Sequence, residues 1–428
     1  MSADLRSFLK DAEKAGLVDR STDLLPPAGP VAGRLYEARE RIVICERIRN
    51  HGAAIVAGIA ASRALLARAL GTAPERLVSA IAAAVDSPRP WRIVRDAPFL
   101  AHVHRKPDLG RLVPIVQFYP EKRRRFMTGT IVIARSRTGM NLSFHRMMWL
   151  GRNRLSVRVV PRHLHALLAE HGGKLEVAVV CGVHPAIEIA ASTSGPPALD
   201  ELRVASALLH GKLDCVNLDG FAVPAHAELV LRGRFTGRLA DEGPFVDLTG
   251  TCDGIRRQPV LEIERLYHRE GWLYRTILPG GAEHRALMGI PQESRILRIV
   301  ANAVPGAVAV ALTRGGCSWL HAVVVIRQRA EGDGRNAGLA ALAAHPSLKR
   351  VVVVDDDIDP TDPHDVEWAI ATRFRPDKDL FVIDGARGSS LDPSRDPVTE
   401  TTAKWIIDAT IPLGRPRRDF ERVVPRPE

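Results

Sequence analysis

The middle of the chain carries one strand pattern after another with almost no helix pattern between them, and this run limits the fold most. Stretches rich in β-branched residues and bounded by Gly or Pro recur between about residues 106 and 300. Strands that follow one another without crossover helices pair as antiparallel or barrel-like sheets. We therefore predict a central β domain. Its expected strands are 130–134, 155–160, 175–181, 228–233 and 260–267.

The segments on either side of this run alternate between helix and strand patterns. Apolar residues at helical spacing predict helices, with starts near Ser62 and after Pro74, and short apolar runs predict buried strands. We predict an α/β plus β fold of three domains, residues 1–105, 106–300 and 301–428, ending in an extended, oligomerising tail from Pro412. The expected helices are 4–20, 60–86, 294–303, 337–344 and 364–372, and the expected strands of the last domain are 320–327, 351–354 and 380–383.

Composition argues against nucleic-acid-binding, secreted and membrane proteins and favours an anionic ligand. The chain has 60 Lys and Arg against 49 Asp and Glu, a net charge of +11. A nucleic-acid surface groups basic with aromatic residues, but aromatics are 5% of the chain and its one dense basic run, residues 122–125, is typical of a solvated loop. The five cysteines show no CxxC spacing, and neither a signal core nor a membrane-length apolar run is present. We expect a cytoplasmic protein with no nucleic-acid or membrane partner.

Two polar stretches carry residue types that fit chemistry. In the first, residues 141–146, the side chains of Asn141, Ser143 and His145 alternate along an extended chain and so share one face. Such a row suits a phosphate, a metal or a carboxylate. On spacing alone, a polar turn after a strand explains this stretch better than a site does.

The second stretch brackets a Gly-Pro turn with two acids, Glu242 and Asp247. Two carboxylates held close by a turn repel, so one of them keeps a proton near neutral pH and acts as a general acid. By itself this stretch is better explained as an acidic surface turn. Together with Arg146, however, it supplies one cation and two acids, the groups that a decarboxylation needs. The electron sink that decarboxylation also needs must come from a cofactor.

These stretches resemble the UbiD family of decarboxylases. Residues 141–146 resemble the family's cofactor-anchoring segment, and residues 242–247 resemble its Glu-Gly-Pro-aromatic-Gly-acid signature. Residues 223–230, 354–359 and 368–373 are similar to further family segments and stand in the family's order.

The resemblance implies a central split β-barrel, flavin reductase-like, that binds prenylated FMN. In this family the flavin bonds to an unsaturated acid and accepts the electrons as CO2 leaves. The family's Glu–Arg–acid network maps to Glu242, Arg146 and Asp247, with Asp247 as the proton donor. The implied flavin contacts are Asn141, Ser143, Phe144, His145, Arg146, Arg158, Val159, Val160, His163 and Ser192.

The family holds the flavin phosphate through a divalent metal and a potassium ion. The ligands implied here are Asn141, Glu201 and His163, with His165 as the alternative to His163. An Asn, Glu and His set suits Mn²⁺ or Mg²⁺ better than zinc. Without the resemblance, Glu201 would be read as an acid that the helix dipole favours at a helix start.

The short chain, residues 144–146 and the scarcity of amide side chains resemble the archaeal branch of the family, which decarboxylates anhydromevalonate phosphate in isoprenoid synthesis. A phosphorylated substrate needs extra cations, for which His145, Arg158 and Arg162 are candidates. A heteroaromatic or phenolic acid is the rival substrate class, since the family pattern is altered at Val246 and at residues 279–284. The resemblance also implies a flavin prenyltransferase as cofactor supplier and a homodimer or higher assembly. A non-catalytic flavin-binding helper is a third interpretation, which the intact acid–Arg–acid set disfavours.

Overall fold

The computed structural model describes residues 4–119, 124–193, 195 and 198–423. They form two compact units, Met1–Leu287 and Met288–Glu428. The division into three domains stays a prediction, and Lys122 and Arg123 of the expected basic loop lie outside the described residues. Within the described chain, no helix combines the length and apolar character that crossing a membrane requires.

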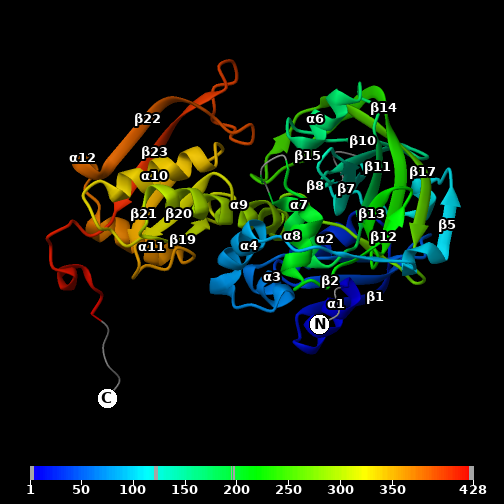
Figure 1. The fold of residues 1–428 in the computed structure, drawn as a ribbon, viewed down its shortest axis with the longest axis horizontal. Helices are drawn as coiled ribbons and strands as arrows, with labels where there is room; N and C mark the ends of the chain where they lie inside the picture. Colours follow the sequence, from blue (N-terminus) through cyan, green and yellow to red (C-terminus); the bar gives the residue numbers. More distant parts are fainter. Residues whose placement is uncertain (1–3, 120–123, 194, 196–197, 424–428) are drawn as a thin grey trace. The chain divides into compact units, whose positions relative to one another are not determined.

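The first unit is built on a nine-stranded sheet in which every pair of strands is antiparallel (Figure 1). The order is β6-β9-β10-β17-β14-β11-β7-β8, with β5 paired to the end of β17, and among the described residues it does not close into a ring. The strands are β5 (His102–Arg105), β6 (Phe126–Met127), β7 (Thr130–Arg135), β8 (Met140–Phe144), β9 (Met147–Gly151), β10 (Arg154–Val157), β11 (Glu176–Cys181), β14 (Leu229–Glu242) and β17 (Arg256–His268).

Three smaller sheets complete this unit. The largest has the order β1-β2-β3-β18, so β18, which follows the long strand β17, joins three strands from the start of the chain. The others are β13-β12-β4 and the two-stranded β15-β16. The strands are β1 (Val18–Leu25), β2 (Ile42–Ile48), β3 (Ala54–Ala57), β4 (Arg92–Val94), β12 (Asp214–Leu218), β13 (Phe221–Pro224), β15 (Phe245–Val246), β16 (Cys252–Asp253) and β18 (Leu273–Arg275).

The helices of the first unit begin where the sequence supplies caps. Ser62 accepts the N–H of Leu65, so the helix start expected near Ser62 is confirmed, and Asp200 accepts the N–H groups of Leu202 and Arg203 at the start of α8. The helices are α1 (Leu5–Lys14), α2 (Pro30–Glu37), α3 (Arg63–Leu70), α4 (Leu77–Asp86), α5 (Leu109–Leu112), α6 (His163–Glu170), α7 (Pro185–Ser192) and α8 (Glu201–Leu208), with 3-10 turns at Pro74–Arg76 and Pro98–Ala101.

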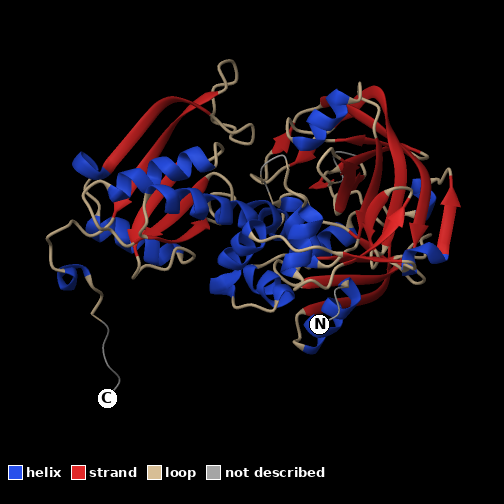
Figure 2. Cartoon of the chain, viewed as in Figure 1, coloured by secondary structure: helices blue, strands red, loops and turns tan. Residues whose placement is uncertain are grey.

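The second unit is a five-stranded sheet of order β19-β20-β21-β23-β22 with helices on both faces (Figure 2). In its central strand, Val351 and Val353 pack with residues of α10, whereas Val352 and Val354 pack with residues of α11. Burial on both faces explains the unbroken apolar run. The elements are α9 (Ala282–Ala303), which crosses the unit boundary, β19 (Ala307–Leu312), β20 (His321–Ile326), α10 (Asp333–Ala344), β21 (Arg350–Asp355), α11 (Pro363–Arg373), α12 (Pro376–Asp379), β22 (Leu380–Arg387) and β23 (Thr401–Ala409).

The predicted α/β plus β fold class is confirmed by these sheets. The tail after Pro412 differs from the extended arm expected. It contains a 3-10 turn, Arg417–Phe420, and folds back on its own unit, where Arg422 contacts Asp365 at 2.8 Å and lies over the ring of Trp368. Pro425 and Pro427 lie outside the described residues, and an oligomerising role for the tail stays a prediction.

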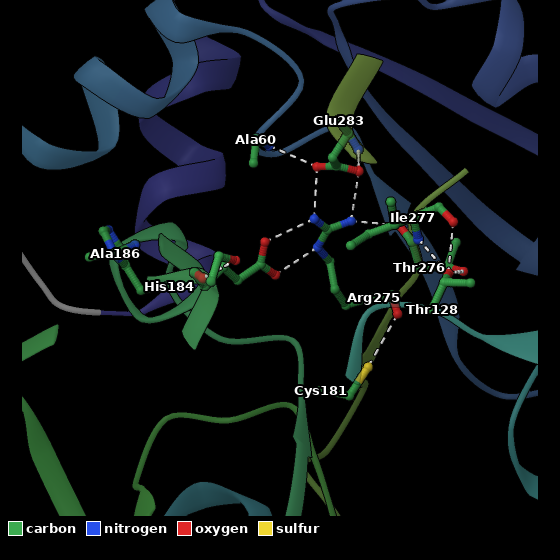
Figure 3. A network of polar contacts seen from close by, with 12 residues as sticks. Ala60, Thr128, Cys181, His184, Ala186, Arg275, Thr276, Ile277 and Glu283 are labelled. Carbon is green, nitrogen blue, oxygen red and sulfur yellow. Dashed lines mark hydrogen bonds and ion pairs between the residues drawn. The ribbon is translucent and has the colours of Figure 1, made fainter. Parts of the chain in front are cut away.

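A buried ion network ties distant parts of the first unit together. Arg275, at the end of β18, is fully buried and donates to both carboxylate oxygens of Glu188 in α7, at 2.9 Å each, and to those of Glu283 in α9, at 2.7 and 2.9 Å. Glu283 also accepts the backbone N–H groups of Gly58 and Ala60, both at 2.8 Å (Figure 3). Burial raises the pKa of Glu188, and the charge of Glu283, the second acid on the same cation, raises it further.

We expect Arg275→Met to lower the free energy of unfolding by about 3–5 kcal/mol, because both carboxylates would lose their buried counter-charge. Urea denaturation followed by circular dichroism measures this loss. The matched control is Arg92→Met. The Arg92 side chain is 68% exposed, so its ion pair with Asp214 contributes about 1 kcal/mol or less to stability. An equal loss of unfolding free energy in the two variants would contradict the assignment of Arg275 as the centre of a stabilising ion network.

Candidate active site

Arg146 occupies the short connection between β8 and β9, and the strands on either side fix its backbone. The N–H of His145 donates to the carbonyl of Thr130 in β7 at 3.1 Å, and the carbonyl of Arg146 accepts the N–H of Arg158 at 3.1 Å. The Arg146 side chain is only 10% exposed. Both ends of the residue are thus anchored in the large sheet before its guanidinium meets any partner.

The structure brings together the three side chains that the sequence analysis grouped. Arg146 Nε and Nη2 donate to the two oxygens of Glu242 at 2.8 and 3.1 Å, and Nη1 donates to Asp247 Oδ2 at 2.8 Å. Glu242 is fully buried and Asp247 is 15% exposed. The pairing with Glu242 is the bidentate fork that a guanidinium favours with a carboxylate.

The turn between the two acids determines where Asp247 lies. Glu242 is the last residue of β14, and Gly243 follows with φ +103°, where an added Cβ would approach the Gly254 carbonyl oxygen to 2.7 Å. The next peptide bond, to Pro244, is cis. Asp247 Oδ1 accepts the N–H of Leu248 at 2.8 Å, so the carboxylate is held at both oxygens.

Two further groups at Arg146 were missed by the sequence analysis. Asp253 in β16 accepts from Arg146 Nη2 at 3.2 Å and also pairs with Arg256. The ring of Phe245 lies under the guanidinium, with 4.0 Å between the Arg146 Cζ and the ring centroid. The hairpin could have revealed them, because the register of β15 with β16 places Phe245 opposite Asp253.

The electrostatics of the cluster favour a permanent positive charge on Arg146. Burial alone would lower its pKa, but the hydrogen bond and charge of Glu242, with the charges of Asp247 and Asp253, raise it above the usual value. Burial likewise acts to raise the pKa of Asp253, yet the hydrogen bond and charge of Arg256 outweigh it and lower that pKa. The site therefore presents a guanidinium that can hold an anion and an acid beside it that can move a proton.

His145 does not supply the positive charge proposed for it. Its Nδ1 faces the Arg158 carbonyl at 2.8 Å, which can only accept, so Nδ1 carries the proton and Nε2 accepts from Ser143 Oγ at 2.9 Å. Burial lowers the pKa of His145 to about 4. The imidazole is thus neutral near pH 7, a correction that sequence could not supply because burial decides it.

Arg158 and Arg162 keep their charge but differ in surroundings. Burial and then the nearby charges of Arg256 and Arg146 lower the pKa of Arg158, whose side chain forms no ion pair with the described acids. Arg162 is exposed immediately before α6. Arg158 is therefore the half-buried cation of this region that is available to an anion.

The remaining residues of the implied flavin set lie on neighbouring elements. Phe144 pairs with Ile131 at the end of β8, and the N–H of Val159 donates to Gln258 Oε1 at 2.8 Å. Val160 is 39% exposed, and Ser192 closes α7 with its hydroxyl donating to the Glu188 carbonyl. Their contact with a flavin stays a prediction.

Two of the implied metal ligands meet, and their donor atoms fit a hard cation. Asn141 Nδ2 is 3.4 Å from Glu201 Oε1, while the buried Asn141 Oδ1 has no hydrogen-bond partner. Burial raises the pKa of Glu201 to about 8, as expected for a carboxylate that lacks a counter-charge. An unpaired amide oxygen beside a buried carboxylate is a donor set that suits Mn²⁺ or Mg²⁺.

His163 and His165 do not complete this set in the described structure. His163 begins α6, and neither histidine forms a hydrogen bond with Asn141 or Glu201 among the described residues. No group of three or more His, Cys, Asp or Glu side chains in the described chain is placed to hold a metal ion. The choice between the two histidines stays open.

Comparisons with known proteins agree along almost the whole chain. A family model for the 3-octaprenyl-4-hydroxybenzoate carboxy-lyase Rift-related domain matches residues 92–282, and the model for the C-terminal domain of the same carboxy-lyase matches residues 285–409. The anhydromevalonate phosphate decarboxylase of Methanothermobacter thermautotrophicus is 42% identical over 98% of this chain and 99% of its own. That of Methanocaldococcus jannaschii is 49% identical over 72% of this chain and 74% of its own.

The solved structures agree with the sequence comparisons. The UbiD-class enzyme HmfF from Pelotomaculum thermopropionicum, in complex with FMN, superposes with a TM-score of 0.94 and 36% identity, covering 98% of this chain and 97% of that one. An evolved dimeric form of HmfF in complex with prFMN gives a TM-score of 0.90 and 34% identity over 99% and 97% of the two chains. From its sequence, its fold and its two matched domains, the chain belongs to the UbiD family.

Proposed function

We propose that this protein is a prenylated-FMN-dependent decarboxylase that removes CO2 from trans-anhydromevalonate 5-phosphate. The observation that carries the proposal is the bidentate Arg146–Glu242 pair with Asp247 on the same guanidinium, inside a chain that is 42% identical over 98% of its length to an anhydromevalonate phosphate decarboxylase. Mn²⁺ or Mg²⁺, K⁺, a cytoplasmic location, supply of the flavin by a prenyltransferase and a homo-oligomeric state belong to the same proposal.

The residues of the cluster divide the reaction between them. Arg146 holds the substrate carboxylate, Glu242 fixes the guanidinium plane, and Phe245 supports it from below. A prenylated flavin held beside this cluster would supply the electron sink that loss of CO2 requires. Asp247 then delivers a proton to the carbon that carried the carboxylate, so the substrate carboxylate leaves as CO2 and a C–H bond takes its place in the alkene product.

A phosphorylated substrate agrees with the charges around this cluster. Arg158 is half-buried without an ion pair to the described acids, whereas His145 is neutral. Arg158 is also one of the implied flavin contacts, so the substrate phosphate and the flavin are both candidate partners of this side chain. Asn141 and Glu201 would hold the divalent metal through the amide oxygen and the carboxylate.

The direct test uses protein that is co-expressed with a flavin prenyltransferase. We expect CO2 release from trans-anhydromevalonate 5-phosphate with kcat/KM about 100-fold above that for the unphosphorylated acid, because a phosphate forms charge-assisted hydrogen bonds. Asp247→Asn should keep its flavin absorbance and lose about 10²–10⁴-fold in kcat. The control is Asp241→Asn, an acid near the end of β14 whose side chain is 61% exposed. Equal or faster turnover of a heteroaromatic acid, or full activity of Asp247→Asn, would contradict the proposal.

Asp253 is a positioning residue in this mechanism, because it touches Arg146 and not the reacting atoms. We expect Asp253→Asn to retain flavin and to lower kcat/KM by about 10-fold to 100-fold, since the guanidinium loses a charged hydrogen-bond partner. Removing this negative charge should also move the alkaline limb of the rate profile to lower pH. A stability loss without any change in the pH profile would assign Asp253 a structural role alone.

Glu201→Gln should reduce the bound Mn²⁺, because the amide keeps the shape of the side chain and removes its charge. Metal content measured by mass spectrometry on purified protein should fall at least about tenfold, and flavin retention should fall with it. Glu264→Gln, at a carboxylate that is 50% exposed, is the matched control. Unchanged metal content in Glu201→Gln would remove Glu201 from the ligand set.

A further inference from the structure

The first unit holds a second candidate binding site, a groove of about 1000 Å³ that shares no residue with the Arg146 cluster. One wall is the turn between β2 and β3, with Arg49, and a second is the segment from β5 to α5, with Arg105, Lys106 and Arg111. Arg125, just before β6, forms a third. Three segments that are far apart in the sequence thus direct basic residues toward one hollow.

The charges of this groove are not balanced by the protein. No acid of the described chain forms an ion pair with the basic side chains of the groove, Arg49, Arg105, Lys106, Arg111 and Arg125, of which all but Arg125 are exposed. Arginines of the first unit that are buried or half-buried do form such pairs, for example Arg6, Arg232 and Arg269.

The one carboxylate of the lining, Asp108, accepts the N–H of Gly110 at 3.1 Å and caps α5. Cations gathered without counter-charge repel one another, and a bound anion would remove that repulsion.

The backbone of the groove is strained at two of its lining positions. Asn50 has φ +64° and Lys106 has φ +46°, the left-handed region that side chains other than Gly rarely adopt. Lys106 is held there because its N–H donates to the Glu264 carbonyl of β17 at 2.8 Å. Backbone strain of this kind persists where the surrounding structure imposes it and is concentrated at binding sites.

The shape and lining of the groove select a small ligand over a polymer. Its volume lies at the upper end of the range of small-molecule sites. The lining holds no Phe, Tyr or Trp among the described residues, so it offers no platform on which nucleic-acid bases could stack. Val103 and Leu112 add a limited apolar surface next to the cations.

We propose that this groove binds an organic diphosphate, whose two phosphate groups span the basic walls while a short hydrocarbon chain contacts Val103 and Leu112. A diphosphate fits better than a monophosphate because the five cations come from three separate walls. Since the groove shares no residue with the Arg146 cluster, this proposal stands or falls independently of the decarboxylase activity.

The test is calorimetric titration of the flavin-loaded protein with inorganic diphosphate and, separately, with pentyl diphosphate. The double variant Arg49→Gln/Arg111→Gln should weaken binding of pentyl diphosphate at least about tenfold, because two charge-assisted contacts are lost. The matched control, Arg76→Gln/Arg238→Gln, removes the same charge from two exposed positions outside the groove and should bind as the wild type does. Arg158→Gln tests whether pentyl diphosphate enters the flavin region instead, and a loss of binding in this variant that equals the loss in the groove variant would place the ligand there and overturn the proposal.

Each other outcome overturns the proposal. Equal weakening in both double variants would reduce the effect to net charge, and unchanged binding in the groove variant would place the ligand elsewhere. Inorganic diphosphate bound as tightly as the pentyl ester would overturn the organic part of the assignment. A single-stranded RNA that displaces pentyl diphosphate and binds more tightly would make the groove a nucleic-acid site instead.

Discussion

The rest of the candidate active site depends on the burial of one guanidinium, that of Arg146. A cation that is nine-tenths enclosed is costly unless acids meet it with good geometry, and Arg146 is met by Glu242, Asp247 and Asp253. Those acids come from the end of one strand, the turn after it and the strand that returns. The hairpin from residues 242 to 256 therefore has to fold against the connection between β8 and β9 before the site exists.

The same charge arrangement occurs a second time with a different result. Arg275 is also surrounded by two carboxylates, but it is fully buried and every partner belongs to the framework. Arg146 keeps a tenth of its surface exposed and has one partner, Asp247, that is itself partly open. Because the Arg275 guanidinium is fully buried among acids of the framework, the first network only joins α7, β18 and α9. The Arg146 guanidinium stays partly accessible, so it can exchange one of its partners for a substrate carboxylate.

Local pattern predicted much of the fold, and the misses have physical causes. Runs rich in β-branched residues located β7 and β11 closely, an unbroken apolar run located β21, and Ser62 marked a helix start. The helix expected at residues 294–303 begins at Ala282 instead, because Pro291 reads as a stop but is accommodated inside α9.

For the site, the sequence placed Arg146, Glu242 and Asp247 correctly as a group that the structure brings together. It missed Asp253, because only the register of β15 with β16 reveals that contact, and it gave His145 a charge that burial removes. The net charge of +11 likewise pointed to anions without saying where they bind. Ion pairing among the described residues narrows that question: many arginines are paired with acids of the fold, whereas Arg158 and the basic residues of the groove lack such a partner, which is why we propose both as anion sites.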